Sequence, residues 1–261
     1  MTISFNEELQ QRAHKLGLVG LVDNWHDFLD EMNVVKKLIS LEENKREEIL
    51  LKNRFKSAQL GSFRPIADFD WKWPKKIDRE IVEDLFMLDF IKEHTNVILI
   101  GANGAGKTMI AKNLAYKAIL SGYKALAINA AVTLNNLSGI TDGIALERKL
   151  NYFAKPDVLI IDELGYLSYA NRHADLLFQL IERRYEKKST IITTNKPFSQ
   201  WNEIFHNAAC ATTLVDRVTH NSDIVCIEVD VSYRYKETEE TNKKKRVKRA
   251  KKNSKTNDDN L

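Results

Sequence analysis

The sequence predicts an α/β protein in which helices cover both faces of a parallel sheet, preceded by a small all-helical N-terminal domain. Three observations support this prediction. Residues 5 to 61 contain apolar residues at helical spacing and no proline. Five apolar runs of strand length follow, and helical patterns separate them. The first of these runs leads directly into a glycine-rich segment that opens a helical pattern.

The N-terminal domain is predicted to span residues 1–62 and to contain three helical segments. The first carries a short apolar stripe that a glycine closes. The second, LVDNWHDFLDEM, places Trp25 and Leu29 at helical spacing. The third begins at about Asn33, carries many charges between its apolar residues, and stops at Gly61. We expect this domain to bind DNA or a partner protein.

Residues 63–77 are predicted to form a linker, and residues 78–237 the α/β domain. The linker concentrates two prolines and four aromatic residues, a composition that favours a structured connection packed against a neighbour. After it the hydrophobic period changes from that of helices to that of strands. The alternation of strands and helices predicts a parallel sheet with helices on both faces. Strands are expected at residues 96–100, 124–128, 158–161, 189–194 and 223–229.

The net charge of +4 is distributed unevenly along the chain. From Thr238 to Leu261, nine basic residues accompany four acidic ones, which gives +5 and leaves the preceding 237 residues at −1. We expect residues 238–261 to form a basic, disordered tail that adds non-specific affinity for DNA. A solubilising end of the chain is the alternative interpretation of such a block.

The sequence gives no indication of a membrane or of an oxidising compartment. No apolar run approaches the roughly 18 residues of a transmembrane helix, and the first residues lack the order of a signal peptide. The two cysteines, Cys210 and Cys226, lie in apolar surroundings without partners at metal-ligand spacing, which predicts ordinary buried thiols. We therefore expect a cytoplasmic protein without a membrane partner.

The segment GANGAGKT, residues 101–108, fits the phosphate-loop pattern of a glycine, four residues, a second glycine, a lysine and a hydroxyl residue. Because it joins a strand to a helix, its backbone N–H groups are expected to converge on phosphate oxygens. Lys107 would reach the β- and γ-phosphates, and the Thr108 hydroxyl would ligate Mg²⁺. A glycine turn without a ligand is the alternative. The residues expected to contact ATP are Gly101, Ala102, Asn103, Gly104, Ala105, Gly106, Lys107, Thr108 and Met109.

Two acids follow the third strand, in VLIIDELGYL. Asp162 ends the strand, where its carboxylate can bind Mg²⁺ together with Thr108. Glu163 is the next residue and is placed to polarise a water molecule for attack on the γ-phosphate. A small-molecule kinase does not need such a water-activating acid, so the pair favours hydrolysis. The alternative is that both acids only cap the following turn.

Asn195 follows the fourth strand, in IITTNKP. Its amide could stand between the γ-phosphate and the attacking water and report the state of the nucleotide. Asparagine before a Lys-Pro turn is also ordinary turn chemistry. The order of the loop, the acidic pair and this asparagine along the chain favours the functional interpretation.

This order of motifs resembles the AAA+ ATPases, which build on the P-loop NTPase fold. The segments DVLIIDELGYL, LLFQLIERRYEKKSTIITTNKPFSQWNEIF and LVDRVTHNSDIVCIEVDVSYRYKE are similar to the IstB-like ATP-binding proteins of insertion sequences and, more loosely, to DnaC-like helicase loaders. The resemblance covers nearly all of residues 5 to 237. It implies an ATPase that uses ATP and Mg²⁺ and helps a transposase encoded by the same element.

The resemblance also implies a homo-oligomer with ATP between neighbouring subunits. The family's arginine finger belongs to an aspartate-arginine pair, here Asp216 and Arg217; a surface contact within one helix is the alternative. The letters SYR match the family's sensor arginine and make Arg234 a second expected contact to the phosphates, although it could equally be a surface residue. Arg183 and Arg184 are weaker candidates, because basic residues are common at helix ends.

The helper activity that the resemblance implies requires duplex DNA to be bound largely without sequence preference, through phosphate contacts. In the third N-terminal helical segment, basic residues alternate with glutamates, so a solvated and salt-bridged helix face is an equally good interpretation. The candidates there are Lys45, Arg46, Lys52, Arg54 and Lys56.

We expect ATP binding to drive assembly on DNA, the assembly to activate or target the transposase, and hydrolysis to disassemble it. Two other functions stay open at this point. One is a DnaC-like replicative helicase loader, which would use the same ATP site and a different partner. The other is a scaffold that binds nucleotide without turning it over.

Overall fold

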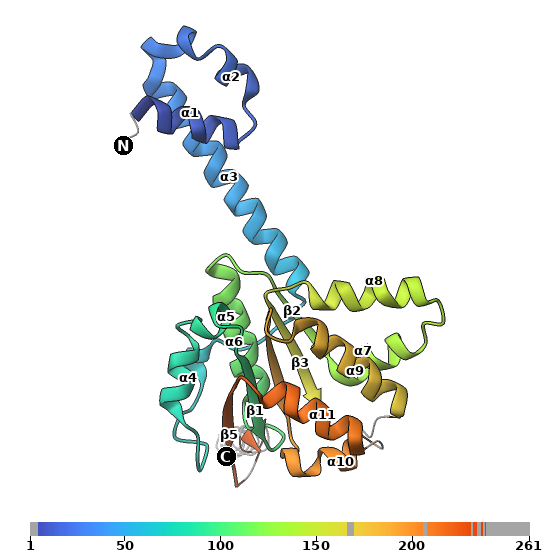
Figure 1. The fold of residues 1–261 in the computed structure, drawn as a ribbon. Helices are drawn as coiled ribbons and strands as arrows, with labels where there is room; N and C mark the ends of the chain where they lie inside the picture. The colour runs from blue at the N-terminus through green and yellow to red at the C-terminus, as the bar shows by residue number, and fades with distance from the viewer. Residues whose placement is uncertain are drawn as a thin grey trace, which may run out of the picture. The chain divides into compact units, whose positions relative to one another are not determined.

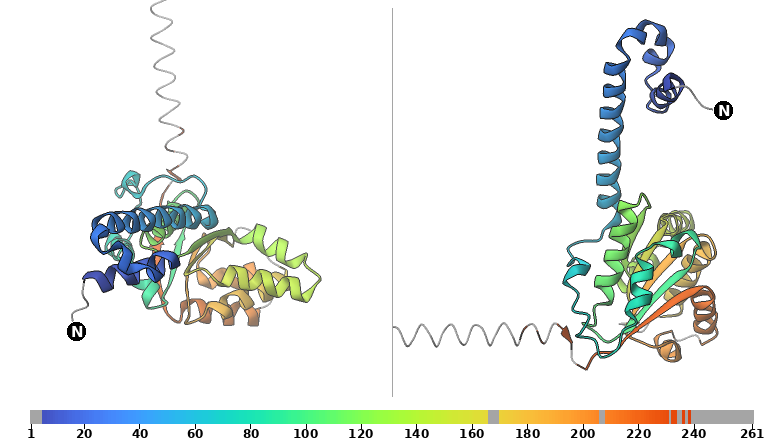
Figure 2. Two further views of the ribbon diagram at one scale, coloured as in Figure 1. Left: turned by 90° about the horizontal axis from the view of Figure 1, so that it is seen from above. Right: turned by 90° about the vertical axis from the view of Figure 1, so that its left-hand side faces the viewer.

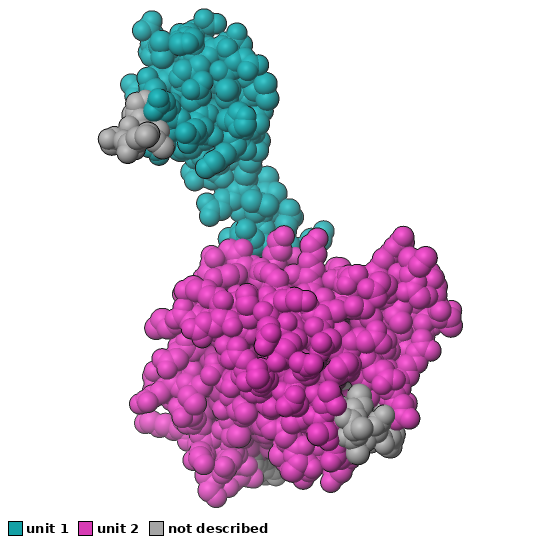
Figure 3. All heavy atoms as spheres, in the orientation of Figure 1, with its two compact units in different colours: residues 1–56 teal, residues 57–261 magenta. Residues whose placement is uncertain are grey.

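The computed structural model describes residues 5–165, 170–205 and 208–230, together with Ser232, Tyr233, Lys236 and Thr238. The chain forms two compact units, residues 1–56 and 57–261, which Figure 3 colours separately. The predicted linker, residues 63–77, therefore belongs to the second unit. The predicted domain limits at residues 62, 77 and 237 stay predictions.

The N-terminal unit is helical, as predicted. It contains α1 (Phe5–Lys15), α2 (Val19–Asp23), a 3-10 helix η1 (Trp25–Glu31) and most of α3 (Met32–Ala58). A small core of mostly apolar side chains from these helices closes it, comprising Leu9, Ala13, Leu16, Trp25, Val35 and Ile39. The prediction of an α-helix through Trp25 and Leu29 is wrong. At three residues per turn Leu29 is rotated away from Trp25, so Trp25 is buried while Leu29 is 46% exposed.

An ion pair joins two helices of this unit. Arg12 on α1 donates from Nη2 to Glu43 Oε2 on α3 at 2.6 Å and from Nε to Oε1 at 3.0 Å. These hydrogen bonds hold the pKa of the Glu43 carboxyl below its usual value. The ion pair thus joins α1 to α3 in addition to the small core.

The second unit contains a five-stranded parallel sheet in the order β2-β3-β4-β1-β5, visible in Figure 1. Every predicted strand is present, with ends that differ by up to three residues. The largest difference is at the end of β3, which continues through both acids. The strands are β1 (Asn96–Gly101), β2 (Ala125–Asn129), β3 (Val158–Leu164), β4 (Ser189–Thr194) and β5 (Ser222–Ile227).

Helices cover both faces of the sheet, which confirms the predicted fold class. On one face, α6 (Lys107–Leu120) packs against β1, β2, β3 and β4. On the other, α7 (Ala130–Ser138), α9 (Asn171–Arg184) and α11 (Ala208–Thr219) share one apolar core with β1, β2, β3 and β4, and α8 (Gly143–Ala154) packs against α9. Figures 1 and 2 show α6 on one side of the sheet and α9 and α11 on the other.

The segment before β1 is fixed onto the sheet domain by hydrogen bonds. Its elements are η2 (Ile66–Asp68), α4 (Arg79–Leu85) and α5 (Asp89–Lys92). The buried Asn113 of α6 accepts from the Ile66 amide at 2.9 Å and donates to the Arg64 carbonyl at 2.9 Å. Farther along, the Lys75 amide donates to the Glu228 carbonyl at 2.8 Å. These contacts place Arg64 and Ile66 beside α6 and Lys75 beside the residue that follows β5.

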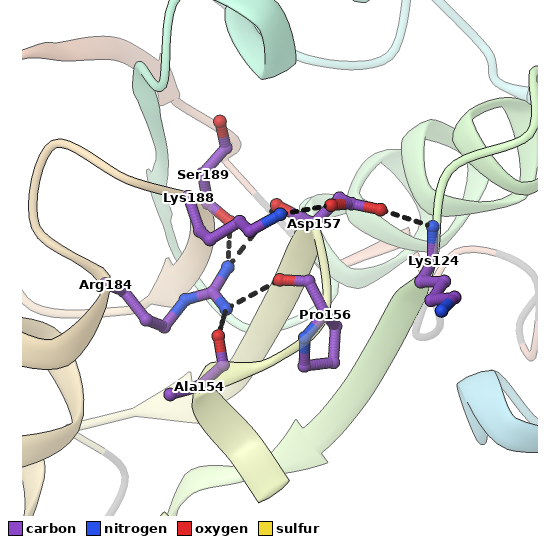
Figure 4. Close-up of polar contacts among 7 residues, drawn as sticks. All are labelled: Lys124, Ala154, Pro156, Asp157, Arg184, Lys188 and Ser189. Atoms are coloured by element: carbon purple, nitrogen blue, oxygen red, sulfur yellow. Dashed lines mark hydrogen bonds and ion pairs between the residues drawn. The ribbon is translucent and has the colours of Figure 1, made fainter. Parts of the chain in front are cut away.

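A buried arginine ties together the beginnings of β3 and β4 (Figure 4). Arg184, only 1% exposed, donates to the carbonyls of Ala154 and Pro156, each at 2.8 Å, and to the Ser189 carbonyl. Its Nε donates to Thr190 Oγ1 at 3.0 Å. Burial lowers the pKa of Arg184 to about 9, so its guanidinium is still charged at neutral pH.

Asp157 lies next to this cluster and accepts from Lys188 Nζ and from the Lys124 amide. Burial raises the pKa of Asp157, but the hydrogen bonds from Lys188 and Lys124 outweigh burial and leave it below its usual value. A carboxyl with a lower pKa in the folded chain stabilises the fold above its unfolded-state pKa. This stabilisation is lost as the pH falls through the folded-state value.

The exposure of Cys226 differs from the sequence prediction. Cys226 is exposed, which contradicts the predicted buried thiol, because β5 is an edge strand with a partly exposed face. The side chain of Cys210 lies outside the described residues.

Two remaining short helices are η3 (Phe198–Gln200) and α10 (Trp201–Ile204). In the described part of the chain, no helix combines the length and the apolar composition needed to cross a bilayer.

Replacing Arg184 with methionine is expected to lower the free energy of unfolding by about 3 kcal/mol or more, because several buried carbonyls lose their donor. The matched control is Arg183→Met, which removes a neighbouring arginine whose ion pair with Glu147 is partly exposed and is worth about 1 kcal/mol or less. Urea denaturation of both variants measures the difference. Equal losses would show that the buried cluster does not stabilise the fold.

Candidate functional site

The candidate site lies at the carboxyl edge of the sheet, where β1, β3 and β4 end. In the strand order, β4 lies between β1 and β3. The glycine loop after β1 and the acids at the end of β3 are therefore separated by the end of one strand. The residues of β4 that follow Ile192 fill the space between them.

The loop between β1 and α6 has a backbone that only glycine can adopt. Gly104 and Gly106 have φ values of +80° and +96°, in the left-handed region that side chains disfavour. A Cβ atom on Gly106 would lie 2.5 Å from Cε2 of Phe69, and one on Gly104 would lie 2.1 Å from Oγ of Ser232. Gly106 caps α6 without a side chain, so the backbone N–H groups of the first helical turn face the loop.

Lys107 begins α6, and its ammonium group is folded onto the loop. Its Nζ donates to the carbonyls of Gly101 and Ala102 at 2.7 and 2.8 Å, and the residue is 8% exposed. The carbonyl groups of Gly101 and Ala102 thus hold the ammonium group of Lys107 against the loop. The cation is fixed beside the helix N-terminus, where both attract an anion.

Thr108 and Asp162, predicted from the sequence as partners, are in direct contact. Thr108 Oγ1 donates to Asp162 Oδ1 at 2.8 Å, which brings the first turn of α6 to the end of β3. A second hydroxyl, Thr193 Oγ1 on β4, donates to the same Oδ1 atom at 2.6 Å. The Thr193 oxygen also accepts from the Glu163 amide at 2.9 Å.

The two adjacent acids are directed apart by a shift in strand register. Ile161 is opposite Ile192 and Leu164 is opposite Thr194, so Asp162 and Glu163 together face the single residue Thr193. Glu163 has φ +61°, in the left-handed region. Its exposed side chain accepts at Oε2 from Nδ2 of Asn129, the last residue of β2, at 2.9 Å. Asp162 instead turns to Thr108.

A cavity of about 650 Å³ opens in front of these residues. This volume is in the range of small-molecule and cofactor sites. Aromatic side chains from the segment before β1, with Tyr233, form its apolar walls: Phe63, Phe69, Trp73 and Tyr233. The predicted site residues that line it are residues 103–109, Glu163 and Asn195.

The other predicted residues lie elsewhere or outside the described chain. Arg217 on α11 contacts α9: its Nε is 3.3 Å from Glu182 Oε2, and its guanidinium lies 4.5 Å from the centre of the Tyr185 ring. It is not among the described residues that line the cavity. Arg184 is used by the buried cluster described above, which rules it out as a finger. Arg234 lies outside the described residues.

The oxygen atoms of Thr108 and Asp162 fit a magnesium ion. Mg²⁺ takes oxygen ligands and binds proteins through one or two carboxylates, with the remaining positions taken by water and phosphate oxygens. Oγ1 of Thr108 and Oδ1 of Asp162 lie 2.8 Å apart beside the glycine loop. Among the described residues, no group of three or more His, Cys, Asp and Glu side chains could hold a metal ion of another type.

Thr193 and Asn129 were missed as site residues by the sequence analysis. Each lies at the end of a strand, Thr193 beside Asp162 and Asn129 beside Glu163. The available signal was a polar residue at a strand end, in TTNKP and AIN. That signal becomes useful only with the strand order, because the order decides which strand ends are neighbours.

Comparison with known families gives a match over most of the chain. The model of the family described as IstB-like ATP binding protein matches residues 18–241. A protein of Geobacillus stearothermophilus, named as an ATP-binding protein of insertion sequence IS5376, is 33% identical over 239 residues, which covers 88% of this chain and 95% of that protein. The corresponding IS21 protein of Pseudomonas aeruginosa is 38% identical over 194 residues, 74% of this chain and 73% of that protein.

Two solved structures share the fold. A crystal structure of DnaI superposes with a TM-score of 0.52 at 21% identity, covering 64% of this chain and 88% of that chain. The replication initiator DnaA, in a structure with AMPPCP and single-stranded DNA, gives a TM-score of 0.52 at 18% identity, covering 69% of this chain and 54% of that one. These likenesses confirm the predicted AAA+ type of fold for the sheet domain.

Replacing Gly106 with alanine is expected to destabilise the fold more than replacing Gly122, because only the first new Cβ meets another residue. Both glycines have similar φ values, +96° and +94°, and a Cβ on Gly122 has nothing within 4 Å. The strain of a left-handed alanine, about 1–2 kcal/mol, is therefore common to both variants. Urea denaturation measures the difference. The double variant with Phe69→Ala should recover part of the extra loss, and strictly additive losses would show that the contact with Phe69 is not its cause.

Proposed function

We propose that this chain, which belongs to the family of IstB-like ATP-binding proteins, is an ATPase that helps transposition. ATP binding assembles subunits on duplex DNA, the assembly activates or targets the transposase of the same element, and hydrolysis disassembles it. The observation that carries this proposal is the hydrogen bond between Thr108 and Asp162. It joins the helix after the glycine loop to the strand end that bears Glu163, and both Thr108 and Glu163 border the cavity.

The triphosphate binds along the glycine loop in this proposal. The left-handed backbone at Gly104 and Gly106 lets N–H groups of the loop approach phosphate oxygens closely. Lys107 exchanges the two loop carbonyls it now contacts for the β- and γ-phosphates. The nucleoside occupies the part of the cavity walled by Phe69, Trp73 and Tyr233.

Thr108 and Asp162 would hold magnesium, which would supply positive charge beside the phosphate oxygens. Glu163 accepts the proton of the attacking water, for which its exposed carboxylate borders the cavity. Asn195, at the end of the neighbouring strand, donates to the γ-phosphate or orients the same water. Asn129, the last residue of β2, donates a hydrogen bond to the Glu163 carboxylate and orients it.

Arg217 acts on the ATP of a neighbouring subunit. Its guanidinium lies on α11, held by Glu182 and the face of Tyr185, and does not border the cavity of its own chain. An arginine fixed in this way can be brought to a neighbour's γ-phosphate when subunits assemble, where a planar guanidinium stabilises developing charge. Arg234 stays a predicted second contact to the phosphates.

The names of two relatives support the proposed partner. Both are named as ATP-binding proteins of insertion sequences, which supports a transposase as the partner. For DNA, Lys45 and Arg46 on α3 already pair with glutamates of the same helix, at 2.9 and 2.7 Å. Exposed pairs of this kind exchange easily for phosphate, and the basic tail adds further charge.

Glu163→Gln and Arg217→Ala should each lower ATP turnover by about 100-fold or more in the presence of DNA, with ATP binding retained. Mixing the two variants should restore part of the turnover, because an Arg217→Ala subunit with intact Glu163 receives the finger from a Glu163→Gln neighbour. Arg148→Ala, which removes an exposed arginine on α8, is the control and should keep full turnover. Equal rates for the parent and Glu163→Gln would remove Glu163 from its proposed role, and a parent without turnover would leave a nucleotide-binding scaffold. A mixture that never recovers would contradict a finger shared between subunits.

The full chain, loaded with ATP, should bind duplex DNA with an affinity that falls steeply as salt rises and varies little with sequence. Substituting glutamine for the nine basic residues of the tail should reduce the salt dependence.

The same ATP-loaded complex should retain the purified transposase of its element and not the replicative helicase. Retention of the helicase alone would favour a helicase loader.

A further inference from the structure

We propose that Thr193 is a positioning residue that sets both acids of the site with one hydroxyl group. The proposal rests on the ATPase function proposed above and concerns a residue that the motifs did not identify. Thr193 borders the cavity with one side of its side chain and is otherwise completely buried on β4. It faces Asp162 and Glu163 together, because the register of β3 shifts at this point.

The hydrogen-bond geometry fixes the direction of each interaction. A threonine hydroxyl has one hydrogen to donate and two lone pairs to accept with. The hydrogen is given to Asp162 Oδ1 at 2.6 Å, because a carboxylate only accepts. A lone pair receives the backbone N–H of Glu163 at 2.9 Å. The same oxygen thus orders the side chain of one acid and the main chain of the next.

For Asp162, the second hydroxyl donor matters when magnesium is bound. The carboxylate oxygen Oδ1 now accepts from both Thr108 and Thr193. Thr108 would ligate the metal through a lone pair of its oxygen, and its hydrogen could still be donated to Asp162. The hydrogen bond from Thr193 comes from the neighbouring strand β4 and would hold the same oxygen from a second direction. It then holds Asp162 in the orientation that meets the metal without a search among rotamers.

For Glu163, Thr193 replaces the missing partner of the sheet ladder. Two residues of β3 oppose one residue of β4, so the extra backbone amide has no carbonyl of the ladder to donate to. Glu163 also adopts a left-handed φ of +61°, which is unfavourable for a residue with a side chain. The Thr193 oxygen satisfies that amide. It thereby stabilises the turn of the backbone that directs the Glu163 carboxylate into the cavity.

A neighbouring threonine provides a matched control. Thr194 is equally buried, but its hydroxyl bonds only with the backbone of Lys196 among the contacts observed, at 3.1 and 3.3 Å. Successive residues of a strand point to opposite faces, so Thr194 does not face Asp162. Thr193→Val and Thr194→Val each remove one buried hydroxyl from the same strand. Thr193→Ser removes the methyl group and keeps the hydroxyl.

The experiment measures the full chain in two states. In the ligand-free protein, hydrogen exchange of the Glu163 amide is followed by NMR. With ATP, the rate is measured as a function of ATP and of Mg²⁺ concentration. Thr193→Val should speed exchange of the Glu163 amide by about tenfold or more. It should lower kcat by about tenfold or more and raise the Mg²⁺ concentration for half-maximal rate, while KM for ATP at saturating Mg²⁺ changes less than about twofold.

Thr193→Ser should behave as the parent in every measurement, and Thr194→Val should leave the Mg²⁺ dependence and the Glu163 amide unchanged. Unchanged exchange of the Glu163 amide in Thr193→Val would overturn the proposal, as would an unchanged Mg²⁺ dependence. If Thr193→Val does not fold, Thr193→Cys, a weaker donor of similar size, takes its place under the same criteria. Should the parent itself not hydrolyse ATP, the proposed function fails; the exchange of the Glu163 amide and the Mg²⁺ dependence of ATP binding then decide on Thr193.

Discussion

The position of β4 between β1 and β3 is the constraint on which the candidate site depends. Neighbouring strands are about 4.8 Å apart, so the glycine loop and the acids of β3 are separated by roughly 10 Å at the edge of the sheet. Thr108 crosses this gap, because α6 begins directly after the loop and the Thr108 side chain in its first turn contacts Asp162. Thr193 contacts the same carboxylate from the end of the intervening strand. A sheet with β1 beside β3 would not place Thr193 and Asn195 between the two motifs.

The shift in register at the end of β3 gives the two acids different surroundings. Adjacent residues of a regular strand point to opposite faces, which would place one of them away from the loop. Here the strand gains one residue relative to β4, and Glu163 takes up a left-handed conformation. Strain of this kind is common at functional sites and persists where surrounding contacts determine the backbone. The contacts in this case are the Thr193 hydroxyl on the amide and Asn129 on the carboxylate.

The two ends of the sheet serve different purposes. At the amino ends of β3 and β4, Arg184 is fully enclosed and donates hydrogen bonds to backbone carbonyls. These bonds join α8, α9 and both strands. At the carboxyl ends, the polar groups border a cavity and several of them, such as Lys107, contact groups that a phosphate could replace. The enclosed arginine therefore stabilises the fold at the amino ends of the strands. The carboxyl ends instead keep polar groups beside a cavity that a ligand can enter.

The sequence by itself determined the class of fold, the positions of all five strands and the glycine loop with its lysine and threonine, because hydrophobic period and glycine spacing are local properties of the chain. It also identified Asp162 as the partner of Thr108. The tertiary structure alone decided which strand ends are neighbours, and with them the places of Thr193 and Asn129, each more than 29 residues from the acid it contacts. It likewise decided that Arg184 is buried while Arg217 stays on the surface of α11, since two arginines in similar helical patterns differ only in what folds over them.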